Sequence, residues 1–315
     1  MVINRRLGLM LNIGNASNAN KRKRIGAGIV GRTWTARGSG RAWRGVASSS
    51  DGTKLVAVAA GSDLIYTSTD SGVSWTSRDS TRNWVSVASS SDGTKLVAVV
   101  TSGQIYTSTN SGVTWTPRDS NRDWRSVASS SDGTKLYATV NSGLVYISTN
   151  SGVNWSALIN SGIRNWSSIT CSQDGTKVAA VANTGWIYIS TDSGATWTQK
   201  DSNRAWTSIA SSSDWTKMVA TVTNGQIYTS TDSGETWTAR ESNRDWRSVA
   251  SSADGTKLVA AVDAGQIYTS TDSGVSWTAR DSNRSWRSVA SSADGGKLVA
   301  VATFGDLIYT SDYMG

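Results

Sequence analysis

The sequence predicts an all-β fold: a seven-bladed β-propeller of four-stranded antiparallel blades. Three observations lead to this prediction: a repeat of about 40 residues, short strand-like stretches inside each repeat, and tight-turn residues between the stretches. Seven tryptophans, spaced 40 to 42 residues apart, mark one position of the repeat: Trp43, Trp84, Trp124, Trp166, Trp206, Trp246 and Trp286. A four-stranded unit cannot bury both of its faces alone, so a closed ring of such units is expected.

The second copy of the repeat illustrates the strands in order. We expect strands at residues 84–89, 96–100, 105–109 and 115–118. The first two are separated by Ser-Asp-Gly-Thr, in which Asp favours an Asx turn and Gly a positive φ. A Gly-centred turn precedes the third strand, and a second tight turn precedes the fourth. Strands this short, with turns this close, are typical of an antiparallel meander.

The two ends of the chain predict how the ring closes. The seventh copy stops before its fourth strand, whereas residues 31–37 match residues 274–280, the fourth strand of the sixth copy. We therefore expect the N-terminal strand to complete the last blade, which removes an open sheet edge. The expected domains are a basic N-terminal arm at residues 1–30 and a propeller at residues 31–315.

The composition excludes several kinds of site. The chain has no His, one cysteine (Cys171) and two glutamates, Glu235 and Glu241. A Ser-His-Asp triad, a His-ligated zinc and a Cys-rich metal site are therefore excluded, and we expect neither a metal nor a cofactor. No run of 18 apolar residues is present, so we expect no transmembrane segment.

A second motif lies before the fourth strand of six copies. It reads Ser/Thr-x-Asp-x-Gly-x-x-Trp, as in Ser68 to Trp75, with Asn in place of Asp in two copies. The motif positions are Asp70, Asn110, Asn150, Asp192, Asp232 and Asp272. Because Asn keeps the hydrogen-bond acceptor but loses the charge, we interpret these residues as structural turn formers.

This motif resembles the Asp box of bacterial-neuraminidase-repeat propellers. The layout is closest to the seven-bladed photosystem II stability/assembly factors, and the resemblance implies architecture rather than activity. The sialidase Arg triad and Phe/Tyr-Arg-Ile-Pro motif are absent. A glycosidase needs two carboxylates that flank one bond. The Asp residues outside the repeat pattern are Asp63, Asp123, Asp245, Asp263 and Asp306. We expect no enzyme, with an Asp-box glycoside hydrolase as one alternative.

Candidate ligand-binding residues lie on the face opposite the Asp-box turns. Seven arginines, each two residues before a marker tryptophan, form a predicted ring: Arg41, Arg82, Arg122, Arg164, Arg204, Arg244 and Arg284. Each either pairs with an acidic residue three positions earlier or binds an anionic or sugar ligand. The neighbouring Gly-centred turns add Gln104, Gln226 and Gln266. Trp186 and Phe304 depart from the repeat and are candidate ligand contacts, whereas Trp215 replaces a turn Gly.

The arm carries much of the net charge of +8. Its candidate assembly residues are Arg5, Arg6, Leu7, Leu9, Leu11, Lys21, Arg22, Lys23 and Arg24. The apolar stretch is short and interrupted, so it gives no clear cleaved signal peptide. We expect the arm to mount a binding propeller on a protein assembly such as a virus particle. The exposed face of the propeller would then recognise a glycan or protein. Nucleic acid is a possible partner of the basic arm only. The further alternative is an assembly factor or chaperone.

Overall fold

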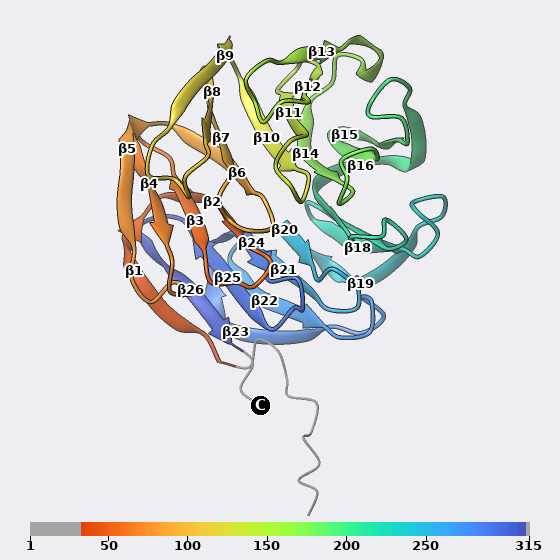
Figure 1. Cartoon of the computed structure of the whole chain (residues 1–315). Coiled ribbons are helices and arrows are strands. Elements are labelled where there is room, and N and C mark those ends of the chain that lie inside the picture. The colour runs from red at the N-terminus through yellow and green to blue at the C-terminus, as the bar shows by residue number, and fades with distance from the viewer. Residues whose placement is uncertain (1–32, 313–315) are drawn as a thin grey trace, which may run out of the picture.

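The computed structural model describes residues 33–312, which form a ring of β-sheets (Figure 1). One 3-10 turn, η1 (Ile159–Ser161), is the sole helical element in this range, so the predicted all-β class is confirmed. The predicted arm at residues 1–30 lies outside the described residues, and no observation tests its boundary with the propeller.

Five of the sheets contain four strands each. The first two along the chain are β2 (Trp43–Ser48), β3 (Leu55–Ala59), β4 (Asp63–Ser68) and β5 (Thr76–Arg82), and then β6 (Trp84–Ser89), β7 (Leu96–Val100), β8 (Gly103–Ser108) and β9 (Thr116–Arg122). The third is β10 (Trp124–Ser129), β11 (Leu136–Val140), β12 (Val145–Ser148) and β13 (Ser156–Leu158). The fourth is β20 (Trp246–Ser251), β21 (Leu258–Val262), β22 (Gly265–Ser270) and β23 (Thr278–Arg284). The fifth joins β24 (Trp286–Ser291), β25 (Lys297–Ala302), β26 (Asp306–Asp312) and β1 (Thr35–Arg41).

The remaining sheet has six strands. They are β14 (Trp166–Cys171), β15 (Val178–Ser190), β16 (Thr198–Ser211), β17 (Met218–Val222), β18 (Gly225–Ser230) and β19 (Thr238–Arg244). The prediction of seven separate four-stranded blades is therefore wrong, because the described chain forms six sheets. The fourth and fifth repeats share the six-stranded sheet, since β16 pairs with β15 through its first half and with β17 through its second. The pairs Asn183–Ala205 and Gly185–Arg204 extend β15 and β16 through residues that the sequence predicts as a Gly-centred turn and as the loop between two repeats.

The predicted closure by the N-terminal strand is confirmed. Strand β1 pairs antiparallel with β26, with Thr35 opposite Thr310 and Arg37 opposite Ile308. Side-chain packing then joins this sheet to the next, because Val299 and Ile308 share an apolar cluster with Trp43. The two ends of the described chain therefore hold the ring together through both hydrogen bonds and apolar contacts.

The apolar core lies between neighbouring sheets. In one cluster, Val58 and Ile65 of the first sheet pack with Trp84 and Val87 of the second. Every marker tryptophan is at most 1% exposed, and each packs edge-on against a tyrosine with ring centroids 5.0–5.2 Å apart. Burial of such large aromatic surfaces is the main stabilising contribution to the ring.

The Asp-box-like turns have the structural role expected from the sequence. Asp70 Oδ1 accepts the backbone N–H of Ser74 at 2.9 Å, and hydrogen bonds from Ser74 and Ser68 lower the Asp70 pKa to about 2. Asn110 Oδ1 accepts the equivalent N–H of Thr114 at 2.9 Å. Since Asn performs the same function as Asp, the acceptor matters here rather than the charge.

Trp215 is a local departure from the repeat. It occupies the turn position that is Gly in the other copies, at φ 70°, in the region that disfavours bulky side chains. Its ring is 1% exposed and belongs to an apolar cluster that also contains Met218. Its burial offsets the backbone strain, since a buried indole contributes several kcal/mol, against about 1–3 for such a backbone conformation.

Candidate functional site

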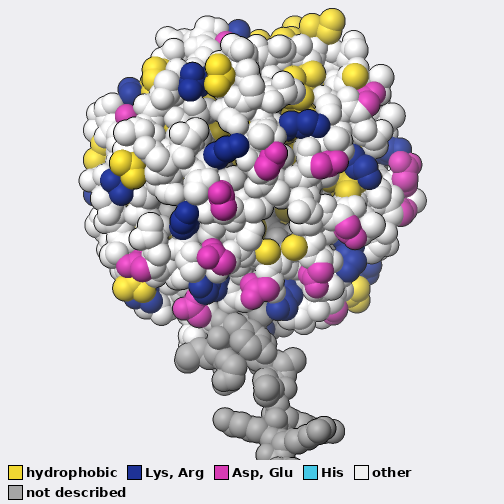
Figure 2. Space-filling model, viewed as in Figure 1, with side chains coloured by type: hydrophobic (Ala, Val, Ile, Leu, Met, Phe, Trp, Pro, Cys, Tyr) yellow, Lys and Arg dark blue, Asp and Glu magenta, His cyan; other side chains and the backbone are white. Residues whose placement is uncertain are grey.

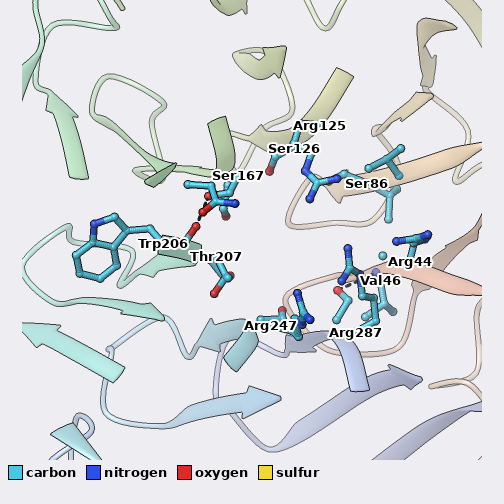
Figure 3. Close-up of a pocket in the computed structure, with 18 of the residues that line it drawn as sticks. Arg44, Val46, Ser86, Arg125, Ser126, Ser167, Trp206, Thr207, Arg247 and Arg287 are labelled. Atoms are coloured by element: carbon cyan, nitrogen blue, oxygen red, sulfur yellow. Dashed lines mark hydrogen bonds between the residues drawn. The ribbon is translucent and has the colours of Figure 1, made fainter. Parts of the chain in front are cut away.

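A cavity of about 190 Å³ lies in the centre of the ring, where the innermost strands of the sheets meet (Figure 3). Six innermost strands begin with a marker tryptophan, and the seventh, Trp206, lies within β16; all seven tryptophans are buried between sheets. Successive side chains of a strand point to opposite sides, so the next residue points away from that core. All seven of these next residues line the cavity: Arg44, Val85, Arg125, Ser167, Thr207, Arg247 and Arg287.

A β-bulge accompanies this position in every innermost strand. The pairing register shifts between the marker tryptophan and the residue two positions on, as between Trp43 and Gly45 or Trp124 and Ser126. The intervening residue has no direct partner in the ladder. Bulges redirect side chains in this way and are frequent next to binding sites. Each copy of the repeat therefore presents to the channel one side chain from a residue outside the pairing ladder.

Four of these side chains are arginines, which we call the channel arginines: Arg44, Arg125, Arg247 and Arg287. Figure 3 shows them extending from different strands toward the cavity. Arg247 Nη2 donates to Asp245 at 2.8 Å and to Asp263 at 3.0 Å. Within residues 33–312, no carboxylate forms a salt bridge with the other three.

Crowding perturbs two of the channel arginines. Burial lowers the pKa of Arg287 to about 10, and the charges of Arg44, Arg125 and Arg247 add to that effect. Burial also lowers the pKa of Arg125, followed by the charge of Arg44, while Asp123 partly opposes the shift. Arg125 is nevertheless an exposed residue, so its desolvation is partial. The basic side of the channel thus holds more positive charge than its neighbours neutralise.

The other side of the channel is polar and uncharged. Ser167 and Thr207 lie there, apart from the arginines (Figure 3). Ser167 Oγ donates to the backbone oxygen of Trp206 at 2.8 Å, and Thr207 Oγ1 lies 2.9 Å from the backbone oxygen of Trp246. Asn183 and Thr223 add further polar groups to the same part of the wall.

The seven arginines predicted as a ligand ring, here called the rim arginines, are held by the protein itself. They stand at or beside the outer strand ends rather than in free loops; Arg82 and Arg122, for instance, end β5 and β9. Each guanidinium lies over a tyrosine ring at 4.1–4.7 Å. Pairing with the acidic residue three positions earlier is confirmed for five: Arg82, Arg122, Arg204, Arg244 and Arg284. Their ligand binding stays a prediction.

The remaining candidate contacts differ in availability. The side-chain amides of Gln104, Gln226 and Gln266 donate to backbone oxygens at 2.9–3.0 Å, so they brace their own sheets. Trp186 is partly buried against the core. Phe304 is 84% exposed at φ 62°, and nothing in the described chain covers it. Whether any of these five contacts a ligand stays a prediction.

The Asp residues outside the repeat pattern all have polar partners. Arg41 Nη1 donates to both oxygens of Asp63 at 3.0 Å, and the Tyr309 hydroxyl donates to Asp306 at 2.9 Å. Asn141 donates to Asp123 at 2.9 Å, while Asp245 and Asp263 share Arg247.

No group of three or more His, Cys, Asp or Glu in the described part of the chain could hold a metal ion. Among the same residues, no helix is long and apolar enough to cross a membrane.

Sequence reasoning missed the channel arginines. The available signal was positional: Arg follows the marker tryptophan in four of seven copies, and alternation along a strand places that residue opposite the core. Figure 2 shows basic and acidic side chains interspersed over the viewed surface, with no large patch of one sign.

The fold has known counterparts. No protein-family model and no curated protein matches the chain in sequence. YCF48 from Cyanidioschyzon merolae is 15% identical, with a TM-score of 0.69 over 89% of this chain and 98% of that chain. A structure of YCF48 bound to D1 peptide is 15% identical, with a TM-score of 0.70 over 90% and 97%. An ancestral GH74 enzyme is 18% identical, with a TM-score of 0.71 over 90% of this chain and 46% of that chain. The chain is thus similar in fold to these proteins; the expected propeller layout is supported, and no family model adds support for an Asp-box family.

Proposed function

We propose that this chain is a non-catalytic binding propeller that takes an anionic group of a glycan or protein ligand into its central channel. The observation that carries the proposal is that Arg44, Arg125 and Arg287 line one cavity and form no salt bridge with a carboxylate of residues 33–312. Guanidinium groups form short, charge-assisted and frequently bidentate hydrogen bonds to oxyanions. An incoming anion would also relieve their mutual repulsion, so binding gains from both effects.

Binding without catalysis is supported by the state of the acidic residues. Asp245 and Asp263 are the two carboxylates that meet near the channel, and one Arg247 nitrogen lies between them. Glycoside hydrolysis needs two carboxylates on either side of one bond, whereas these two are both hydrogen-bonded to the same arginine nitrogen. A panel of chromogenic glycosides tests the hydrolase alternative. Turnover that disappears in Asp245→Asn or Asp263→Asn would overturn the non-catalytic proposal.

The mounting of the propeller on a larger assembly, such as a virus particle, remains part of this proposal. It rests on the sequence of residues 1–30, which carry a basic cluster and a short apolar stretch. A protein ligand, as for an assembly factor, is the second candidate. It is favoured by the similar fold of YCF48 in its structure with D1 peptide. Glycan and peptide arrays probed with the same protein distinguish the two candidate ligand classes.

Calorimetric titration with inorganic phosphate at low ionic strength tests the anion site itself. We expect saturable binding by the wild type and none by the triple variant Arg44→Gln, Arg125→Gln, Arg287→Gln. Arg240→Gln is the matched control, because Arg240 lies on an outer strand and donates to Thr229 at 3.1 Å. Equal binding by the wild type and the triple variant would contradict the proposal, as would the absence of binding.

A further inference from the structure

The channel has two chemically distinct sides. Going round the ring, the sixth, seventh, first and third copies contribute arginines, whereas the fourth and fifth contribute Ser167 and Thr207. Asn183 and Thr223 lie beside these hydroxyls. A ligand that fills this cavity therefore meets positive charge on one side and neutral polar groups on the other (Figure 3).

The hydroxyls of the uncharged side are oriented by the protein. Each has a single proton, which the short contacts to the backbone oxygens of Trp206 and Trp246 use. The Thr221 hydroxyl, 2.8 Å from Thr207 Oγ1, then donates to Thr207, which leaves one lone pair on Thr207 and two on Ser167 available as acceptors. Such a wall suits a ligand that donates hydrogen bonds from its own hydroxyl groups, as a sugar does.

The basic side favours a tetrahedral oxyanion over a carboxylate. Arg44, Arg125 and Arg287 approach from three different strands, β2, β10 and β24. A phosphate or sulfate ester presents three terminal oxygens, one for each guanidinium, whereas a carboxylate presents two. Arg247 Nη2 is already bound to two aspartates, so Arg247 offers no free donor fork to the ligand.

We infer that the channel binds one sugar residue carrying a phosphate or sulfate monoester, with the ester on the channel arginines and the sugar hydroxyls on Ser167 and Thr207. This inference rests on the proposed function, because it specifies the anionic ligand. The cavity of about 190 Å³ is below the roughly 300–1,000 Å³ of drug-sized sites, which limits the enclosed part to one sugar ring. The rest of a longer glycan would extend out of the channel.

Calorimetric titration of the full chain with five small ligands tests the inference. The ligands are glucose 6-phosphate, glucose 6-sulfate, glucose, inorganic phosphate and inorganic sulfate, all at matched low ionic strength. We expect one or both sugar esters to bind about tenfold more tightly than the matching inorganic anion, and glucose to bind more weakly than either ester. Comparison of the two esters shows whether the channel prefers a phosphate or a sulfate group.

Substitutions on the uncharged side separate the sugar contact from the anion contact. Ser167→Ala and Thr207→Val should weaken ester binding about tenfold and leave binding of the inorganic anion unchanged. Ser129→Ala is the matched control, because Ser129 Oγ also donates to a backbone oxygen, at 2.9 Å, but near the opposite mouth of the channel. Melting curves of all variants verify that each is folded.

The outcomes distinguish this inference from the function on which it rests. If inorganic phosphate binds and neither ester binds more tightly, the sugar-ester inference is overturned and the anion site stands. If glucose binds as tightly as the esters, the inference is likewise overturned. If no anion binds, both the inference and the proposed function fail.

Discussion

Replacing Arg287 by Gln should stabilise the protein while removing its anion site. The pKa of Arg287 is lowered to about 10, first by burial and then by the neighbouring arginines. One pKa unit corresponds to about 1.4 kcal/mol, so the charge costs the folded state about 3 kcal/mol before screening by solvent. Water in the open channel and the lost packing of the aliphatic stem reduce the expected gain to about 1–2 kcal/mol.

The sign of this effect follows from the direction of the shift. Near pH 7, Arg287 is protonated in both the folded and the unfolded chain, so the full penalty is present; it declines only as the pH rises above about 10, where the folded chain loses this proton first. For a chain of this size, the gain corresponds to an increase in Tm of roughly 2–3 °C. Tryptophan fluorescence during heating, at pH 7 and low salt, measures it, and added salt should narrow the difference.

Two comparisons make the measurement decisive. Arg240→Gln removes an arginine that has a partner, so its Tm should stay the same or fall. Phosphate should raise the Tm of the wild type but not that of Arg287→Gln. At a hundredfold excess of phosphate over Kd, the free energy of unfolding of the wild type should rise by up to about 3 kcal/mol. A lower Tm for Arg287→Gln without added ligand would refute the reasoning, because it would mean that the charge is compensated in the folded state.

Further predictions concern closure, acid stability, the turn tryptophan and the arm. Deleting residues 31–37 should lower the Tm sharply, and an unchanged melting curve would contradict closure by β1. Hydrogen bonds lower the pKa of Asp51 and Asp70 to about 2, so their stabilisation is complete above pH 4 and lost as the pH falls toward 2; circular dichroism that stays native below pH 2 would disagree. Trp215→Gly should lose about 2–3 kcal/mol in denaturant unfolding, because the buried indole contributes more than the backbone strain costs, and a gain would reverse that ranking. The full chain should form a larger assembly than a version without residues 1–29 in mass measurements, and equal masses would exclude self-assembly through the arm.

The sequence predicted the features that depend on local chemistry. The Asp-box-like turns follow from an acceptor, a Gly and a Trp at fixed spacing, and Asp70 and Asn110 both adopt the expected geometry. The pairing of β1 with β26 also followed from sequence, since the missing strand of the last repeat could be matched to residues 31–37. Both predictions use contacts that are encoded within a few residues or repeated in every copy.

The number of sheets depends on longer-range hydrogen bonding. Whether Asn183 pairs with Ala205 decides if β15 and β16 run through the connection, and no residue pattern signals that pairing. The repeat count therefore gave seven blades, whereas the described chain has six sheets.

The channel arginines were not predicted from the sequence for a related reason. Arg122 and its equivalents are conspicuous in the repeat, but Tyr146 and Asp119 hold Arg122 in place. Arg125 lies one residue past the tryptophan in the same copy, where a β-bulge turns it into the channel. The approach of Arg44, Arg125 and Arg287 to one another spans most of the chain, so only the assembled ring brings them together.

Anomalous diffraction from selenate shows directly whether the central channel binds an oxyanion. Crystals grown without phosphate or sulfate are soaked in selenate, which has the shape and charge of sulfate and a strong anomalous signal. We predict a selenium peak in the channel between Arg44, Arg125 and Arg287, absent from Arg287→Gln crystals. Peaks confined to the outer surface, with none in the channel, would contradict it.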